Sequence, residues 1–176
     1  MDDLPIDEED GKLWGLPPEH LWLLGAIAAG SAMLEQDLGV TLRSQLGLDP
    51  PLANILVSGM SLNMMIDKVI AIARFQLAGT SVLRDLEQWA IRARAASKNR
   101  NAALHSVWFS NPPAGELFSA SFAKVASESP FQARTWTEEE LQELISELAS
   151  LVSEFVTFWS RMGHIEGQPG ETPSQA

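Results

Sequence analysis

A histidine follows an arginine by five residues in the segment Arg100-Asn101-Ala102-Ala103-Leu104-His105. An imidazole accepts or donates a proton near neutral pH, so His105 is a candidate general acid or base. The planar guanidinium of Arg100 carries five N–H donors and suits a phosphate group. On a helix, Asn101 and His105 share one face, where the asparagine amide can orient the imidazole. The segment therefore predicts a phosphodiester-cleaving site, with a structural histidine at a helix end as the alternative.

Three further residues could support this site. Glu35 interrupts the apolar stripe of its predicted helix, as Arg100 does in its own, and a buried guanidinium needs an anion, so we expect these two residues to pair. Lys98 could hold an RNA backbone, although a solvated basic face is the alternative. Trp108 could stack on a base, whereas most of the tryptophans are expected to anchor the core or an interface.

Apolar residues recur at spacings of three and four in four long stretches, each of which predicts an amphipathic helix. The stretches are residues 17–42, 52–77, 83–107 and 137–162. Gly79 is typical of a helix C-terminus, and Thr80 or Ser81 can cap the next helix. Thr137 and Glu140 have the spacing of a capping box at the start of the fourth helix.

Four helices in succession predict an all-α fold, an up-and-down four-helix bundle. Between the third and fourth helices, a turn cluster at 110–115 and a serine-rich segment predict a small hairpin or an irregular loop. Residues 17–162 are expected to form one helical domain. The acidic residues 1–16 and the glycine- and proline-containing residues 163–176 have the composition of disordered tails.

The composition narrows the possible functions. The chain has no cysteine, which excludes disulfides, thiolate zinc sites and cysteine nucleophiles. No histidine and carboxylate have a metal-ligand spacing, so we expect neither metal nor cofactor. A net charge of −11 opposes RNA binding, but six of the acids lie in the first ten residues and residues 84–100 are locally basic. No apolar run is long enough to span a bilayer and no export signal is recognisable, so a cytoplasmic protein without a membrane partner is expected.

The segment from Arg100 to His105 resembles the signature of the HEPN superfamily, which is arginine, a polar residue, a few more residues and histidine. It falls near the end of the third of four predicted helices, where that family carries it, and the architecture is similar over residues 17–162. The resemblance implies a HEPN-like bundle. It also implies that active members cut RNA without metal, usually as homodimers that bring two copies of the motif together.

These observations predict a ribonuclease of the toxin or antiviral (phage-defence) type, cleaving RNA by attack of a ribose 2′-hydroxyl. Arg100, Asn101 and His105 would be its catalytic residues, with Glu35, Lys98 and Trp108 supporting them. A single chain supplies one suitable histidine, so we expect a composite site in a homodimer, with an antitoxin as a possible partner. The alternative is a non-catalytic HEPN-like binding or dimerisation module partnered with a nucleotidyltransferase, which the overall acidity favours.

Overall fold

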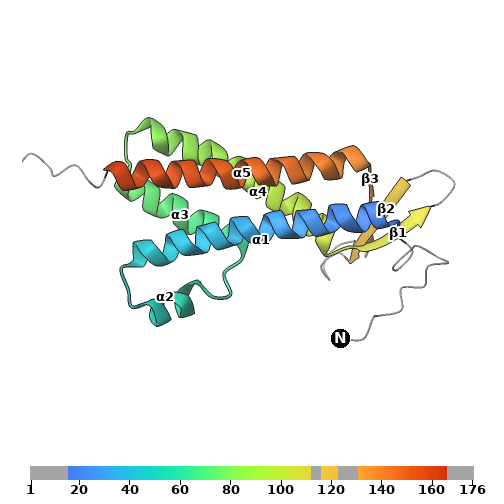
Figure 1. Ribbon diagram of the computed structural model, residues 1–176, viewed down its shortest axis with the longest axis horizontal. Coiled ribbons are helices and arrows are strands. Elements are labelled where there is room, and N and C mark those ends of the chain that lie inside the picture. Colours follow the sequence, from blue (N-terminus) through green and yellow to red (C-terminus); the bar gives the residue numbers. More distant parts are fainter. Residues whose placement is uncertain (1–15, 112–115, 123–130, 166–176) are drawn as a thin grey trace, which may run out of the picture. The chain divides into compact units, whose positions relative to one another are not determined.

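The computed structural model describes residues 16–111, 116–122 and 131–165 (Figure 1). Over these ranges the chain is mostly helical, as the sequence predicts. The elements are α1 (Pro18–Leu46), α2 (Pro50–Val57), α3 (Leu62–Gln76), α4 (Ser81–Leu104), β1 (Val107–Asn111), β2 (Glu116–Phe122), β3 (Phe131–Trp136) and α5 (Glu138–Ile165). The predicted tails lie outside the described residues, except for Leu16, which is buried, and residues 163–165, which continue α5.

The chain divides into two compact units. The first comprises Met1–Ala32 and Ala95–Ala149, and the second comprises Met33–Arg94 and Ser150–Ala176. The helices α1, α4 and α5 are each divided between the units, with one part in the first unit and the other in the second. The first unit holds the strands and the motif at the end of α4, whereas the second holds α2 and α3. One domain over residues 17–162 stays a prediction.

The helix caps predicted at the starts of α4 and α5 are present in the structure. Thr80 Oγ1 accepts a hydrogen bond from Leu83 N at 3.2 Å, which caps α4 after Gly79. The φ angle of Gly79 is +81°, a conformation that glycine adopts without a steric penalty. At α5, Thr137 Oγ1 accepts from Glu140 N at 3.1 Å and Glu140 Oε2 accepts from Thr137 N at 3.0 Å. The predicted capping box is therefore confirmed.

The helix predicted over residues 52–77 is wrong, because the chain forms α2 and α3 there. Gly59 has a φ angle of +79°, which a right-handed helix cannot accommodate, and Ser61 Oγ accepts from Met64 N at 3.3 Å to start α3. The break leaves α2 only eight residues long. Its buried side chains are Ala53 and Val57, while three large apolar residues are exposed: Leu52, Ile55 and Leu56.

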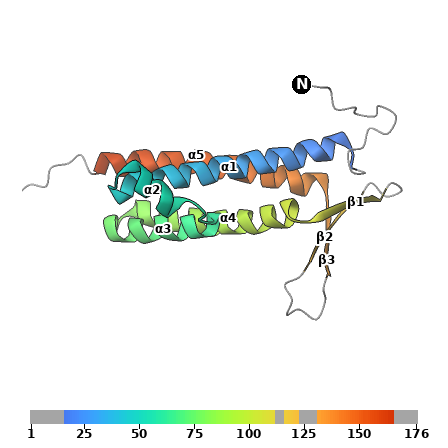
Figure 2. The same cartoon turned by 90° about the horizontal axis from the view of Figure 1, so that it is seen from below.

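Between α4 and α5 the described residues form a three-stranded antiparallel sheet in the order β1-β2-β3 (Figure 2). The sequence predicts only a small hairpin or an irregular loop there, so the structure adds a third strand. Because α4 ends at Leu104, Val107 opens β1 rather than closing the third helix. The register pairs Trp108 with Ser119 and Ser119 with Arg134. Since β2 is paired along both edges, the backbone hydrogen bonds of this serine-rich strand are satisfied by its neighbours. Residues 112–115 of the predicted turn lie outside the described residues.

The core follows the apolar faces of the long helices. In the first unit, the buried face of α1 carries Leu23 and Ile27, whereas Ala28 is exposed. On α5 the predicted stripe is confirmed, since Leu141 and Leu148 are fully buried. In the second unit the largest fully buried side chain is Trp89 of α4, whose ring centroid lies 5.0 Å from that of Phe155 on α5.

Candidate active site

The three motif residues lie together at the C-terminal end of α4, in the first unit. Arg100 is half-buried, Asn101 is exposed, and His105 is exposed at the turn that follows the helix. The backbone N–H of His105 still donates to the carbonyl of Asn101 at 3.1 Å, which continues the helical hydrogen bonding by one residue. The imidazole is therefore carried on an ordered backbone and is open to solvent, so a substrate can reach it.

The asparagine orients the arginine. Arg100 Nη1 donates a hydrogen bond to Asn101 Oδ1 at 2.9 Å. The expected hydrogen bond between the side chains of Asn101 and His105 does not form in the part of the chain that the structure describes. The guanidinium of Arg100 donates to the amide oxygen instead, in a charge-assisted hydrogen bond. Asn101 thus fixes the phosphate-binding group of the site.

The end of α4 is capped by side chains that carry no charge. A helix C-terminus leaves carbonyl oxygens without helical partners and has a partial negative charge, both unfavourable for a phosphate. Here Ser106 Oγ donates to the carbonyl of Ala102 at 2.5 Å, and Trp108 Nε1 donates to the carbonyl of Ala103 at 2.7 Å. These two bonds cover acceptors that would repel an anion, and they tie the start of β1 to the helix.

Trp108 has a packing role. Its half-buried ring lies 6.0 Å from the ring of Trp136, centroid to centroid, with an angle of 39° between the planes. Trp136 is 2% exposed and donates through Nε1 to Ser119 Oγ at 2.8 Å. Because its N–H is already bonded to α4 and its ring contacts Trp136, Trp108 supports the motif by holding β1 against the helix end.

An arginine that the sequence interpretation missed lies beside the motif. Arg134 of β3 has its guanidinium carbon 3.5 Å from the centroid of the Trp136 ring. Its Nη1 donates to Asn99 Oδ1 at 3.2 Å, and its Nη2 donates to Glu140 Oε1 at 3.4 Å. Arg134 therefore connects β3, α4 and α5 within the first unit. The only local signal was its spacing of two from Trp136, which places both on one face of a strand once the strand is known.

The remaining predicted supporting residues differ in position. Lys98 is exposed on α4 in the first unit. Glu35 is half-buried on α1 in the second unit, where it lines an open hollow of about 460 Å³ together with Arg43 and Asn54. Its pairing with Arg100 stays a prediction.

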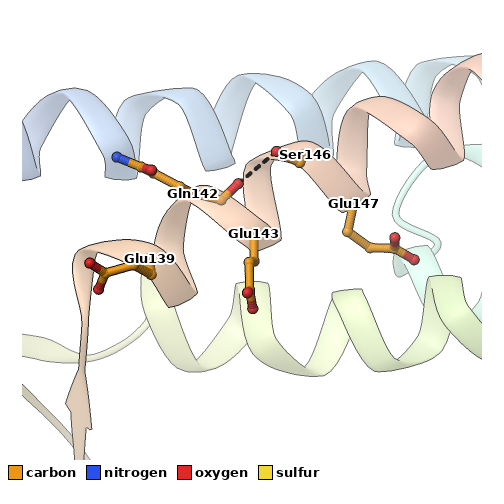
Figure 3. A pocket seen from close by; sticks show the side chains of 5 residues that line it. All are labelled: Glu139, Gln142, Glu143, Ser146 and Glu147. Carbon is orange, nitrogen blue, oxygen red and sulfur yellow. Dashed lines mark hydrogen bonds between the residues drawn. The ribbon is translucent and has the colours of Figure 1, made fainter.

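A large hollow in the first unit is acidic. It is open, has a volume of about 740 Å³, and follows one face of α5 (Figure 3). The lining residues are Glu139, Gln142, Glu143, Ser146 and Glu147. Carboxylates at this density repel phosphate, so this face of α5 is unsuitable for an RNA backbone. Among the described residues, no group of three or more His, Asp or Glu side chains is placed to hold a metal ion.

None of the helices in the described ranges is both apolar and long enough to cross a membrane. Comparison of the chain with protein-family models, with curated proteins and with solved structures found no match. The resemblance to the HEPN superfamily accordingly rests on the motif residues and on the helical architecture.

Proposed function

We propose that this protein is an RNA endonuclease of the toxin or phage-defence type that cleaves without a metal ion. One observation carries the proposal: a solvent-accessible imidazole, His105, follows by five residues a guanidinium, Arg100, that donates to Asn101 at 2.9 Å at the end of α4. A base and a phosphate-binding group on one ordered helix end are the minimum that transesterification of RNA requires.

In the proposed reaction His105 accepts the proton of a ribose 2′-hydroxyl. The resulting oxygen attacks the adjacent phosphorus, the bond from phosphorus to the 5′-oxygen breaks, and a 2′,3′-cyclic phosphate remains on one product. Arg100 donates hydrogen bonds to the non-bridging oxygens, where negative charge increases in the transition state. The departing 5′-oxygen takes a proton from a second acid, leaving a 5′-hydroxyl end.

The second acid suggests a composite site. One chain offers one suitable histidine at the motif, and a two-fold homodimer would supply its symmetry mate. An up-and-down four-helix bundle like that of the HEPN superfamily would present the motif of each copy at the end of its third long helix. An antitoxin could then inhibit the enzyme by covering that helix end.

The test compares the purified wild-type protein with His105→Ala on mixed RNA in the presence of EDTA. We expect the wild type to produce fragments with cyclic phosphate ends and His105→Ala to be slower by about 10²–10⁴-fold. The control is His20→Ala, which removes a histidine at the start of α1 in the same unit and should leave the rate unchanged. Equal degradation by wild type and His105→Ala, or none by either, would contradict the proposal.

The acidity of the first unit favours a second candidate, a non-catalytic binding module of the HEPN-like kind that pairs with a nucleotidyltransferase. The acidic face of α5 would bind a basic partner surface more readily than RNA. This candidate predicts that neither wild type nor His105→Ala degrades RNA. It also predicts that substituting Glu143 and Glu147 with glutamine weakens partner binding, whereas the nuclease proposal predicts no loss of cleavage from the same change.

A further inference from the structure

Arg134 is held in a way that leaves its charge available at the surface. The face of its guanidinium lies on Trp136 and its side chain remains 38% exposed. Stacking on an aromatic ring uses the face of a guanidinium, whereas the N–H bonds project from its edge. Stacking therefore fixes the orientation of Arg134 without occupying its donors.

Most of its donors are also unoccupied by the described residues. A guanidinium has five N–H donors, and the contacts of Arg134 with those residues are one hydrogen bond to Asn99 and one to Glu140. The bond to Asn99, at 3.2 Å, goes to a neutral amide. The bond to Glu140 is long, at 3.4 Å, and the other oxygen of that carboxylate accepts from Thr137 N at 3.0 Å. The positive charge is only weakly compensated.

The position of Arg134 relates it to the motif. Its hydrogen-bond partner Asn99 immediately precedes Arg100 in the chain, so the α carbons of Asn99 and Arg100 are about 3.8 Å apart. Asn99 and Asn101 thus each bind one guanidinium at the same helix end, from β3 and from α4 respectively. Both guanidiniums are therefore bound at the C-terminal end of α4, where they offer one RNA strand two positively charged groups.

We propose that Arg134 binds a phosphodiester of the RNA strand next to the one that Arg100 and His105 cleave. This inference rests on the proposed nuclease function and adds a binding contact to it. Arg134 would act as a phosphate-binding residue that holds the strand in register, with Trp136 and Asn99 keeping its guanidinium in place. A purely structural role, in which Arg134 only connects β3 to α4 and α5, is the competing explanation.

The test measures the affinity of a single-stranded RNA oligonucleotide at several salt concentrations, in a His105→Ala background so that the RNA stays intact. Each phosphate contact to a single strand contributes about 0.7 to the slope of log affinity against log salt concentration. We expect Arg134→Gln to lower this slope by about 0.7 and Arg134→Lys to preserve it. Arg74→Gln is the control, because it removes an equal charge and an ion pair with Glu87 in the second unit and should leave the slope unchanged.

A second measurement needs no substitution of Arg134. Phenylglyoxal modifies accessible arginines, and mass spectrometry of the His105→Ala protein reports each site. RNA should protect Arg134 and not Arg74. An unchanged salt slope in a folded Arg134→Gln protein, or equal modification of Arg134 with and without RNA, would overturn the inference while RNA binding by the parent protein persists. If the parent does not bind RNA at all, the proposed nuclease function fails as well.

Discussion

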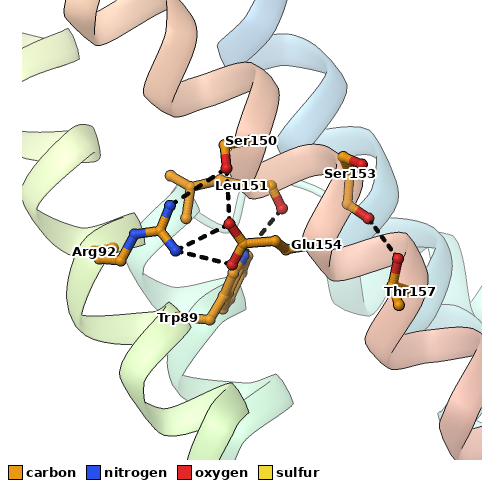
Figure 4. Close-up of polar contacts among 7 residues, drawn as sticks. All are labelled: Trp89, Arg92, Ser150, Leu151, Ser153, Glu154 and Thr157. Atoms are coloured by element: carbon orange, nitrogen blue, oxygen red, sulfur yellow. Dashed lines mark hydrogen bonds and ion pairs between the residues drawn. The ribbon is translucent and has the colours of Figure 1, made fainter.

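The arginines of the two units are held by different chemistry. In the second unit Arg92 Nη1 donates to both oxygens of Glu154, at 2.8 and 3.0 Å, and Ser150 Oγ donates to the same carboxylate at 2.7 Å (Figure 4). In the first unit the shortest hydrogen bond of Arg134 goes to the amide oxygen of Asn99 at 3.2 Å. Arg134 also has an ion pair with Glu140, but at 3.4 Å it is longer than the 2.8 Å pair between Arg92 and Glu154. The charge of Arg92 is therefore more fully compensated than that of Arg134.

The surroundings of the two arginines agree with this difference. Arg92 lies one helical turn from Trp89, which is 1% exposed and donates through Nε1 to the carbonyl of Leu151 at 3.0 Å (Figure 4). The α4 and α5 segments of the second unit are thus joined by a buried aromatic core with an ion pair beside it. Arg134 lies instead on the six-residue strand β3, with its guanidinium over the ring of Trp136. Substitutions in the two regions should accordingly change different measurable properties.

Removing Trp89 should have the largest effect. Trp89→Ala deletes a fully buried side chain and its contact with Phe155, and we expect the free energy of unfolding to fall by about 3–5 kcal/mol in urea titrations. Trp22→Ala is the matched control, since Trp22 is 67% exposed and its loss should cost less than about 0.5 kcal/mol. Similar losses for both variants would show that burial does not distinguish the two tryptophans.

Replacing Arg100 with lysine tests the chemistry of the first unit. Arg100→Lys keeps the positive charge but removes the planar pair of donors, so we expect RNA cleavage to slow by about a hundredfold. Arg84→Lys, an exposed arginine near the start of α4, should cleave at the wild-type rate. Cleavage by Arg100→Lys as fast as by wild type would mean that charge alone suffices at this position.

The smallest effect is expected from the ion pair of the second unit. Arg92 and Glu154 have side chains that are 41% and 36% exposed, so water screens their attraction. A double-mutant cycle with Arg92→Met and Glu154→Gln should give a coupling energy of about 0.2–1 kcal/mol in unfolding experiments. None of these variants should alter RNA cleavage. A coupling of several kcal/mol, or a change in the cleavage rate, would remove the contrast between the two arginines.

The sequence by itself determined the features that depend on neighbouring residues. Gly79, Thr80, and the capping box of Thr137 and Glu140 act within a single turn, so their residue types alone predict where α4 and α5 begin. The backbone hydrogen bond between His105 and Asn101 also follows from helical spacing, because four residues make about one turn.

Only the tertiary structure decided the features that depend on distant residues. The partners of Arg134 are Asn99, Trp136 and Glu140. Asn99 is 35 residues earlier in the chain, and the pairing of β1, β2 and β3 brings Arg134 back to it. Strand pairing is chosen by contacts between segments, and local propensity in a serine-rich stretch does not specify it.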